Sequence, residues 1–235
     1  LSSNHLRGEI PDVLGSLSSL GTINLSYNLL TGAIPDVHDN IHTVNFAYNA
    51  LTGEVPVSIG NAEPDNLSVS FNGVWSTDPD VIAELDESDA LWADSQTVAP
   101  TGLATSNISD TSMTVYWSVI DYTGNVGGYE IYKSTASAGP YVLATTTNSK
   151  SQNGVTVSGL DENTDYYFKV RTFTEPHDFQ KNRVESDFSS IVQATTRHSA
   201  SLVLTESNAQ TLVAEGGATD QIFISLGSAP SGLVY

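Results

Sequence analysis

The sequence lacks cysteine, has a single methionine, and holds only eight Lys and Arg against 27 Asp and Glu. Without cysteine it can form no disulfide and offers neither a thiol nucleophile nor a cysteine-ligated zinc site. The net charge of -19 would repel nucleic acids and anionic membrane surfaces, so we expect neither as a partner. No apolar run approaches the roughly 20 residues that a membrane-spanning helix needs, so we expect no membrane insertion.

Catalytic motifs are missing as well. His38 and His42 lie four residues apart, but the sequence has no H-E-x-x-H metal motif, no G-x-S-x-G nucleophile motif and no phosphate-binding loop. We therefore predict that this chain is not an enzyme and holds no cofactor. The many acids suit solubility in a salty medium, and calcium binding is the alternative that they leave open.

A motif recurs within residues 1–76 at a period of 21–24 residues. Three segments align without gaps, and they read NHLRGEIP from Asn4, NLLTGAIP from Asn28 and NALTGEVP from Asn49. A fourth asparagine, Asn72, continues the spacing. An alternating apolar pair precedes three of the four asparagines: Ile23/Leu25, Val44/Phe46 and Leu67/Val69. Such a pair predicts a short strand that points alternate side chains into a shared core.

The asparagine after each strand can satisfy backbone donors and acceptors where the chain turns, and one such unit cannot bury its apolar side alone. The pattern resembles the plant-type leucine-rich repeat, N-x-L-x-G-x-(I/V)-P, over residues 1–76. The resemblance implies a short solenoid with a concave strand face that binds ligands. Residues 57–66 depart from the pattern, and we expect an irregular outer arc there.

The predicted strands place small polar side chains in columns on the concave face, beside an aromatic strip. Such a face could hold a peptide or a sugar, so the sequence predicts a protein- or glycan-binding site there. Alternatively, these are the ordinary polar positions of a repeat with no ligand. The candidate ligand residues are Thr22, Asn24, Tyr27, Thr43, Asn45, Tyr48, Asn66, Ser68 and Phe71.

Residues 77–97 are predicted to form a capping helix and a linker. The helix begins at Thr77-Asp-Pro-Asp80, where Thr or Asp can cap and Pro79 can stand in the first turn. Ending a repeat stack requires a lid over its open core, and this helix would supply it. Its acids could hold calcium, but they lack the spacing of an EF-hand loop, so we expect them to form a solvated helix face instead. Residues 93–99 have the composition of a linker.

Short strands separated by turn residues follow over residues 98–197, and this pattern predicts an all-β sandwich. Trp117 is a bulky core candidate, and Gly127-Gly128 is one of several predicted turns. Leu160 to Tyr166 has the L-x-x-x-T-x-Y spacing of a tyrosine corner. The stretch resembles a seven-strand fibronectin type III domain. It has no Arg-Gly-Asp tripeptide, and its long loop over residues 174–185 is either a binding loop or merely a variable one.

Residues 198–235 contain two predicted strands around a Glu-Gly-Gly sequence, and they resemble the start of a Calx-beta or cadherin-like sandwich. In that family loop carboxylates can bind calcium, and Glu215 lies near one such loop; the ligand set would be incomplete here. Leu1 falls in mid-repeat and Tyr235 in mid-strand, so we expect a longer polypeptide.

The expected fold is therefore multidomain and mainly β. The expected function is extracellular or cell-surface adhesion or recognition, with the sandwiches as spacers. Because an extracellular-type array without cysteine is typical of bacterial surface proteins, we expect a bacterial source. Two alternatives remain: a non-catalytic accessory region of a large secreted hydrolase, and a purely structural spacer.

Overall fold

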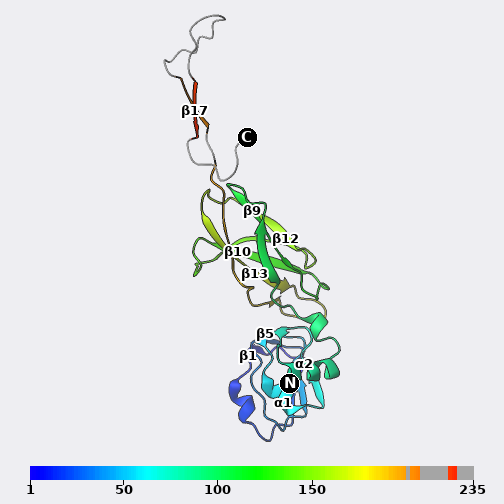
Figure 1. Cartoon of the computed structure of the whole chain (residues 1–235). Coiled ribbons are helices and arrows are strands. Elements are labelled where there is room, and N and C mark those ends of the chain that lie inside the picture. The colour runs from blue at the N-terminus through cyan, green and yellow to red at the C-terminus, as the bar shows by residue number, and fades with distance from the viewer. Residues whose placement is uncertain (200–201, 207–221, 227–235) are drawn as a thin grey trace, which may run out of the picture.

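The computed structural model describes residues 1–199, 202–206 and 222–226. It shows a mainly β chain with a repeat segment, residues 1–97, followed by a sandwich, residues 98–197 (Figure 1). No helix in the described part of the chain is both long and apolar enough to cross a membrane.

The strands of the repeat segment are short, and each pairs in parallel with the equivalent strand of the next repeat. One sheet holds β2 (Thr22–Asn24), β4 (Thr43–Asn45) and β6 (Asn66–Ser68). The other holds β1 (Arg7–Glu9), β3 (Leu29–Gly32), β5 (Ala50–Glu54) and β7 (Gly73–Trp75). The predicted apolar pairs lie inward: Val44, Phe46 and Val69 are fully buried in one continuous core.

A ladder of buried asparagines holds the turns between the two sheets. Asn28, Asn49 and Asn72 accept hydrogen bonds from the backbone N–H groups of Leu6, Leu30 and Leu51, each at 3.0–3.1 Å. Their amide groups donate to backbone carbonyls of their own repeat and of the preceding coil. These bonds confirm the prediction that the asparagines pair with backbone donors and acceptors at the turns. Such pairing is needed because a buried N–H or C=O group without a partner is unfavourable.

The outer arcs differ from repeat to repeat. The first carries a 3₁₀ helix, Asp12–Ser16, and the third carries α1 (Val57–Ala62), so the expectation of an irregular arc over residues 57–66 is wrong in its first half. Pro56 precedes α1 with an extended backbone, and Ile59, within the helix, is fully buried in the core. An apolar anchor of this kind stabilises even a short helix by tertiary packing.

The helix predicted after the repeats is α2 (Pro79–Ser88). Asp78 is its N-cap and accepts from the N–H groups of Asp80 and Val81, as residues of this type do at helix starts. Val81 and Leu85 are buried, and α2 packs on α1 and β6. The sequence pattern also assigns Leu91 to the apolar face of this helix, but Leu91 lies beyond the end of α2 and is more than half exposed.

The segment after α2 is not a linker throughout, contrary to its composition. A 3₁₀ turn spans Ala93–Ser95. Its last residue, Ser95, and the following Gln96 and Thr97 are all buried, with an exposed fraction of 2% or less. Asp89 is also buried, so the expectation that all acids near α2 are solvated is wrong for this residue. Its carboxylate accepts from the N–H groups of Val69 and Ser70 and from two serine hydroxyls, which satisfies donors beside the last strand of the sheet.

The sandwich has two antiparallel sheets. One holds β12 (Gly154–Ser158), β9 (Ser112–Ser118) and β8 (Thr101–Ser106). The other is built on β13 (Asp165–Thr174), which pairs on one side with β10 (Gly127–Ser134) and through it with β11 (Val142–Thr146); the opposite edge of β13 pairs with β14 (Val184–Glu185) and β15 (Val192–Thr195). The sequence pattern favours one last strand from Glu185 to Thr196, and the structure divides this stretch into β14 and β15.

Trp117, Tyr129, Phe168 and Val170 lie in the sandwich core. The tyrosine corner forms as predicted: the Tyr166 hydroxyl accepts from the N–H of Asp161 at 3.0 Å. The predicted turn at Gly127-Gly128 is wrong, because both glycines lie in β10. A Cβ on Gly128 would stand 2.2 Å from the carbonyl oxygen of Thr147, so the glycine permits close approach within the sheet rather than a turn.

Beyond residue 199, β16 (Leu202–Glu206) pairs antiparallel with β17 (Ile222–Leu226). These correspond to the two strands that the sequence predicts in this stretch. Glu215, the weak calcium candidate, lies outside the described residues.

Candidate functional site

The strand face of the β2–β4–β6 sheet brings six of the nine predicted ligand residues together in two in-register columns. The two columns are Thr22, Thr43 and Asn66, and Asn24, Asn45 and Ser68. These side chains alternate with the buried apolar residues of the strands, and all six are exposed or half-exposed. The third column that the pattern suggests is not available, because Ser26, Ala47 and Ser70 are buried.

Four of the six residues line a polar depression of about 490 Å³ on this face. Its rim comes from outside the strands: Asp65 precedes β6, and Glu87 and Ser88 belong to the last turn of α2. The sequence did not predict these three residues as part of the site. Asp65 lies there because it directly precedes β6, whereas only the packing of α2 against β6 brings Glu87 and Ser88 to the depression.

The charged side chains that line the depression are acidic. Asp65 and Glu87 contribute two carboxylates, while no Lys or Arg lines it. His42 approaches Asp65 at 3.9 Å, and both side chains are largely exposed. Within the described residues there is no group of three or more His, Asp or Glu side chains arranged to hold a metal ion. The face can therefore offer hydroxyl, amide and carboxylate groups to a polar or cationic ligand.

The three predicted aromatic residues form a stack along the repeats, confirming the predicted strip as a structural feature. Tyr27 lies on Tyr48 with ring centroids 4.4 Å apart, and Tyr48 lies on Phe71 at 4.5 Å, both nearly parallel. All three adopt positive φ, between 55° and 59°, immediately before the ladder asparagines. This backbone is unfavourable for bulky residues, and the surrounding packing and hydrogen bonds hold it.

The stacking limits what the aromatic strip can bind, because each ring already covers a face of its neighbour. The sandwich covers more of it: Phe179 meets Tyr48 edge-on at 6.1 Å, and Tyr122 meets Phe71 at 5.9 Å. Burial, followed by the proximity of Tyr27, raises the pKa of Tyr48, and burial and Tyr48 raise the pKa of Tyr122 to about 12. Tyr27 remains 40% exposed at the free end of the stack.

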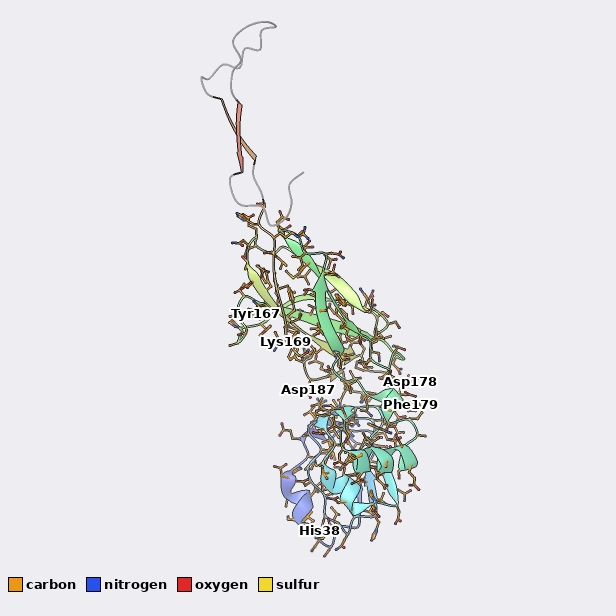
Figure 2. All side chains as sticks on the ribbon, viewed as in Figure 1. His38, Tyr167, Lys169, Asp178, Phe179 and Asp187 are labelled. Atoms are coloured by element: carbon orange, nitrogen blue, oxygen red, sulfur yellow. The ribbon has the colours of Figure 1, made fainter. Side chains whose placement is uncertain are left out.

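The loop over residues 174–185, which the sequence left as either variable or binding, contacts the repeat segment. Figure 2 shows Asp178 and Phe179 at the junction of the sandwich and the repeats. Gln180 is buried there, and its side-chain amide donates to the backbone carbonyls of Asn49 and Phe71. The loop is therefore a contact element between the two parts of the chain.

Comparison with known proteins identifies the sandwich. Residues 98–184 match the fibronectin type III domain family, so the chain contains such a domain; the match ends before β15. No curated protein matches the chain.

Solved structures with similarity to the chain include FN1–FN3 domains of chicken CNTN1, at 19% identity and a TM-score of 0.35, covering 43% of this chain and 31% of that one. An Fn3-like protein from Clostridium thermocellum is 25% identical with a TM-score of 0.33, covering 42% and 92%. A structure described as a myokine is 18% identical with a TM-score of 0.35, covering 43% and 98%.

Proposed function

We propose that this chain is a recognition unit of an extracellular or cell-surface bacterial protein, in which the strand face of the repeat segment binds a protein or a glycan. The observation that carries the proposal is the polar depression where Thr43, Asn45, Asn66 and Ser68 meet the rim of α2. A fibronectin type III domain, commonly an extracellular spacer or binding module, follows the repeats and would connect them to the rest of the protein.

We further propose that residues 1–76 are leucine-rich repeats and that α2 is their cap. The repeat period, the parallel pairing of equivalent strands and the buried asparagine ladder support this assignment. Val81 and Leu85 of α2 join the same core as the strand residues, as a helix that closes a repeat stack would. Residues 198–235 would begin a further Calx-beta-like sandwich.

The chemistry of the face favours a ligand with hydroxyl, amide or basic groups. Asp65 and Glu87 face the depression without a basic counterpart there, so an anionic ligand would meet repulsion. Residues 1–99 carry 14 acids and Arg7 as the one Lys or Arg, which extends that field over the whole repeat segment. We propose no catalytic role for this chain, whether it stands in an adhesion protein or beside a hydrolase.

The test is a screen of the native chain on glycan and protein arrays, followed by affinity measurements on any hit. Asn45→Ala and Asn66→Ala remove amides from the face and should weaken binding about tenfold or more, since a lost hydrogen bond to a ligand costs about 1–2 kcal/mol. Asn61→Ala, an exposed asparagine at the end of α1, is the matched control. Tyr27→Ala tests the free end of the aromatic stack.

If the native chain binds a ligand and both face variants bind it as tightly as Asn61→Ala does, the strand face is not the site. If no partner binds at all, the spacer alternative is favoured over recognition.

A further inference from the structure

The backbone carbonyl oxygens of the three ladder asparagines form a row along the repeats. Each of them accepts a hydrogen bond from a residue that lies after the repeats in the sequence. The carbonyl of Asn72 accepts from the N–H of Thr97 at 2.7 Å. The carbonyl of Asn49 accepts from the amide of Gln180, and that of Asn28 accepts from the amide of Asn182 at 3.5 Å. Donors two residues apart in the loop thus match acceptors on adjacent repeats.

The spacing explains the match. Adjacent parallel strands lie about 4.8 Å apart, whereas alternate residues of an extended chain lie about 6.6 Å apart, so long amide side chains can reach successive repeats. With the loop in place Asn49 and Asn72 are fully buried. A buried carbonyl without a partner costs about 1–3 kcal/mol, so the closed arrangement needs these donors.

Aromatic contacts flank this polar row. Phe179 and His177 meet Tyr48 and Phe71 edge-on, at 6.1 and 6.0 Å. Val184, in β14 at the end of the loop, is buried, and β14 contacts β5 of the repeats. The junction therefore combines apolar burial with satisfied backbone groups, as a stable interface does.

The base of the loop is held firmly to the sandwich. Arg183 binds Glu130 at 2.6 Å and Glu175 at 3.3 Å, and the N–H of Glu175 donates to the carbonyl of Val126. Burial alone would raise the pKa of Glu130, but hydrogen bonds from Arg183 and Arg171 hold it below its ordinary value. On the other side, the hydroxyls of Thr97 and Thr174 lie 2.7 Å apart, which ties the end of the repeats to β13.

The geometry points to an interaction surface on the repeat segment, made of the asparagine carbonyl row and the aromatic stack, whose occupant is loop 174–185 of the same chain. The loop clasps the repeats and fixes the fibronectin type III domain in one orientation. The domain is therefore not a freely rotating spacer. Its loop donates to the backbone carbonyls of the repeats, and the strand face is held at a defined angle to the domain that follows it.

Distance distributions between two spin labels test the clasp in the full chain. Because the chain has no cysteine of its own, the labels attach only to two cysteines introduced at exposed serines. These are Ser18→Cys on the repeats and Ser137→Cys on the sandwich. We expect a single narrow distribution in the labelled chain. Gln180→Ala should broaden it, whereas Gln193→Ala, an exposed glutamine on β15, should leave it unchanged.

A second variant replaces residues 177–182 with a Gly-Ser sequence of the same length. It should broaden the distribution further while the far-ultraviolet circular dichroism of both parts is retained. A broad distribution in the chain with its loop intact, or a narrow one after the loop is replaced, overturns the proposal. This outcome is separate from ligand binding on the strand face, which the array measurements assess.

Discussion

The side-chain carbonyl of Gln96 accepts a hydrogen bond from the backbone N–H of Val74 at 3.1 Å. This is the bond that Asn28, Asn49 and Asn72 each make to the preceding repeat, and the amide of Gln96 also donates to the carbonyl of Val69. A glutamine therefore ends the asparagine ladder from a segment with no repeat signature, and it does so one residue before Thr97 begins the contact with the sandwich.

The ladder should carry much of the stability of the repeat segment. Asn49→Ala leaves the buried N–H of Leu30 without its partner. It also removes one donor from the carbonyls of Leu25 and Phe46, which keep their bonds from Asn28 and Asn72. We expect a loss of about 2 kcal/mol in the free energy of unfolding, because one unsatisfied buried donor costs about 1–3 kcal/mol. Urea unfolding measures it. Asn61→Ala, on the exposed end of α1, should change it by less than about 0.5 kcal/mol; equal effects of the two would contradict the ladder's role.

Gly128 should tolerate no side chain. In Gly128→Ala the new Cβ would stand 2.2 Å from the carbonyl oxygen of Thr147, a backbone atom that cannot rotate away. We expect a loss of about 2 kcal/mol or more, at the upper end of overpacking effects. Gly124→Ala places its Cβ 3.4 Å from the Tyr122 ring, an ordinary contact, and should be nearly neutral. Thermal unfolding of both variants checks the difference, which vanishes if the sheet relaxes.

The tyrosine corner should contribute through its hydroxyl. Tyr166→Phe removes the acceptor for the N–H of Asp161 while the ring stays in the core, so we expect a loss of about 1 kcal/mol. Tyr167→Phe, the next residue and on the opposite side of β13, serves as the control and should have little effect. Denaturant midpoints that shift equally in the two variants would show that the hydroxyl contact is not stabilising.

Lys150 should make stability depend on pH. Its side chain is 2% exposed, bonds to Thr174 at 3.0 Å and lies 3.5 Å above the Tyr122 ring. Burial lowers its pKa from 10.5 to about 8. Between these values the unfolded chain holds the proton and the folded chain does not, so the free energy of unfolding rises with pH across that window.

Lys150→Met removes this linkage. The variant should be more stable than the native chain at pH 7, and its stability should rise less between pH 8 and about 9.5, below the titration of the tyrosines. Urea unfolding at several pH values gives both curves. Parallel curves would mean that Lys150 is well solvated or finds a counter-charge on folding.

The sequence by itself determined the repeat and much of the sandwich, because both depend on local periodicity. The apolar pair before each of Asn28, Asn49 and Asn72 predicts a strand, a turn and the direction of the side chains, and the columns of Thr43 and Asn45 follow from it. The spacing from Leu160 to Tyr166 likewise predicts a contact between residues close in the chain.

Only the tertiary structure decided what completes those patterns. Gln96, Gln180 and Asp89 satisfy backbone groups 19 to 131 residues away, and composition alone made them linker, loop and surface residues. Gly128 looked like a turn because glycine permits both a turn and a close approach. Glu87 reaches the depression because α2 packs on β6. Hydrogen bonding and close packing between distant segments leave no periodic pattern in the sequence. The repeat therefore predicts the central residues of the candidate site, whereas only the tertiary structure shows which residues surround them.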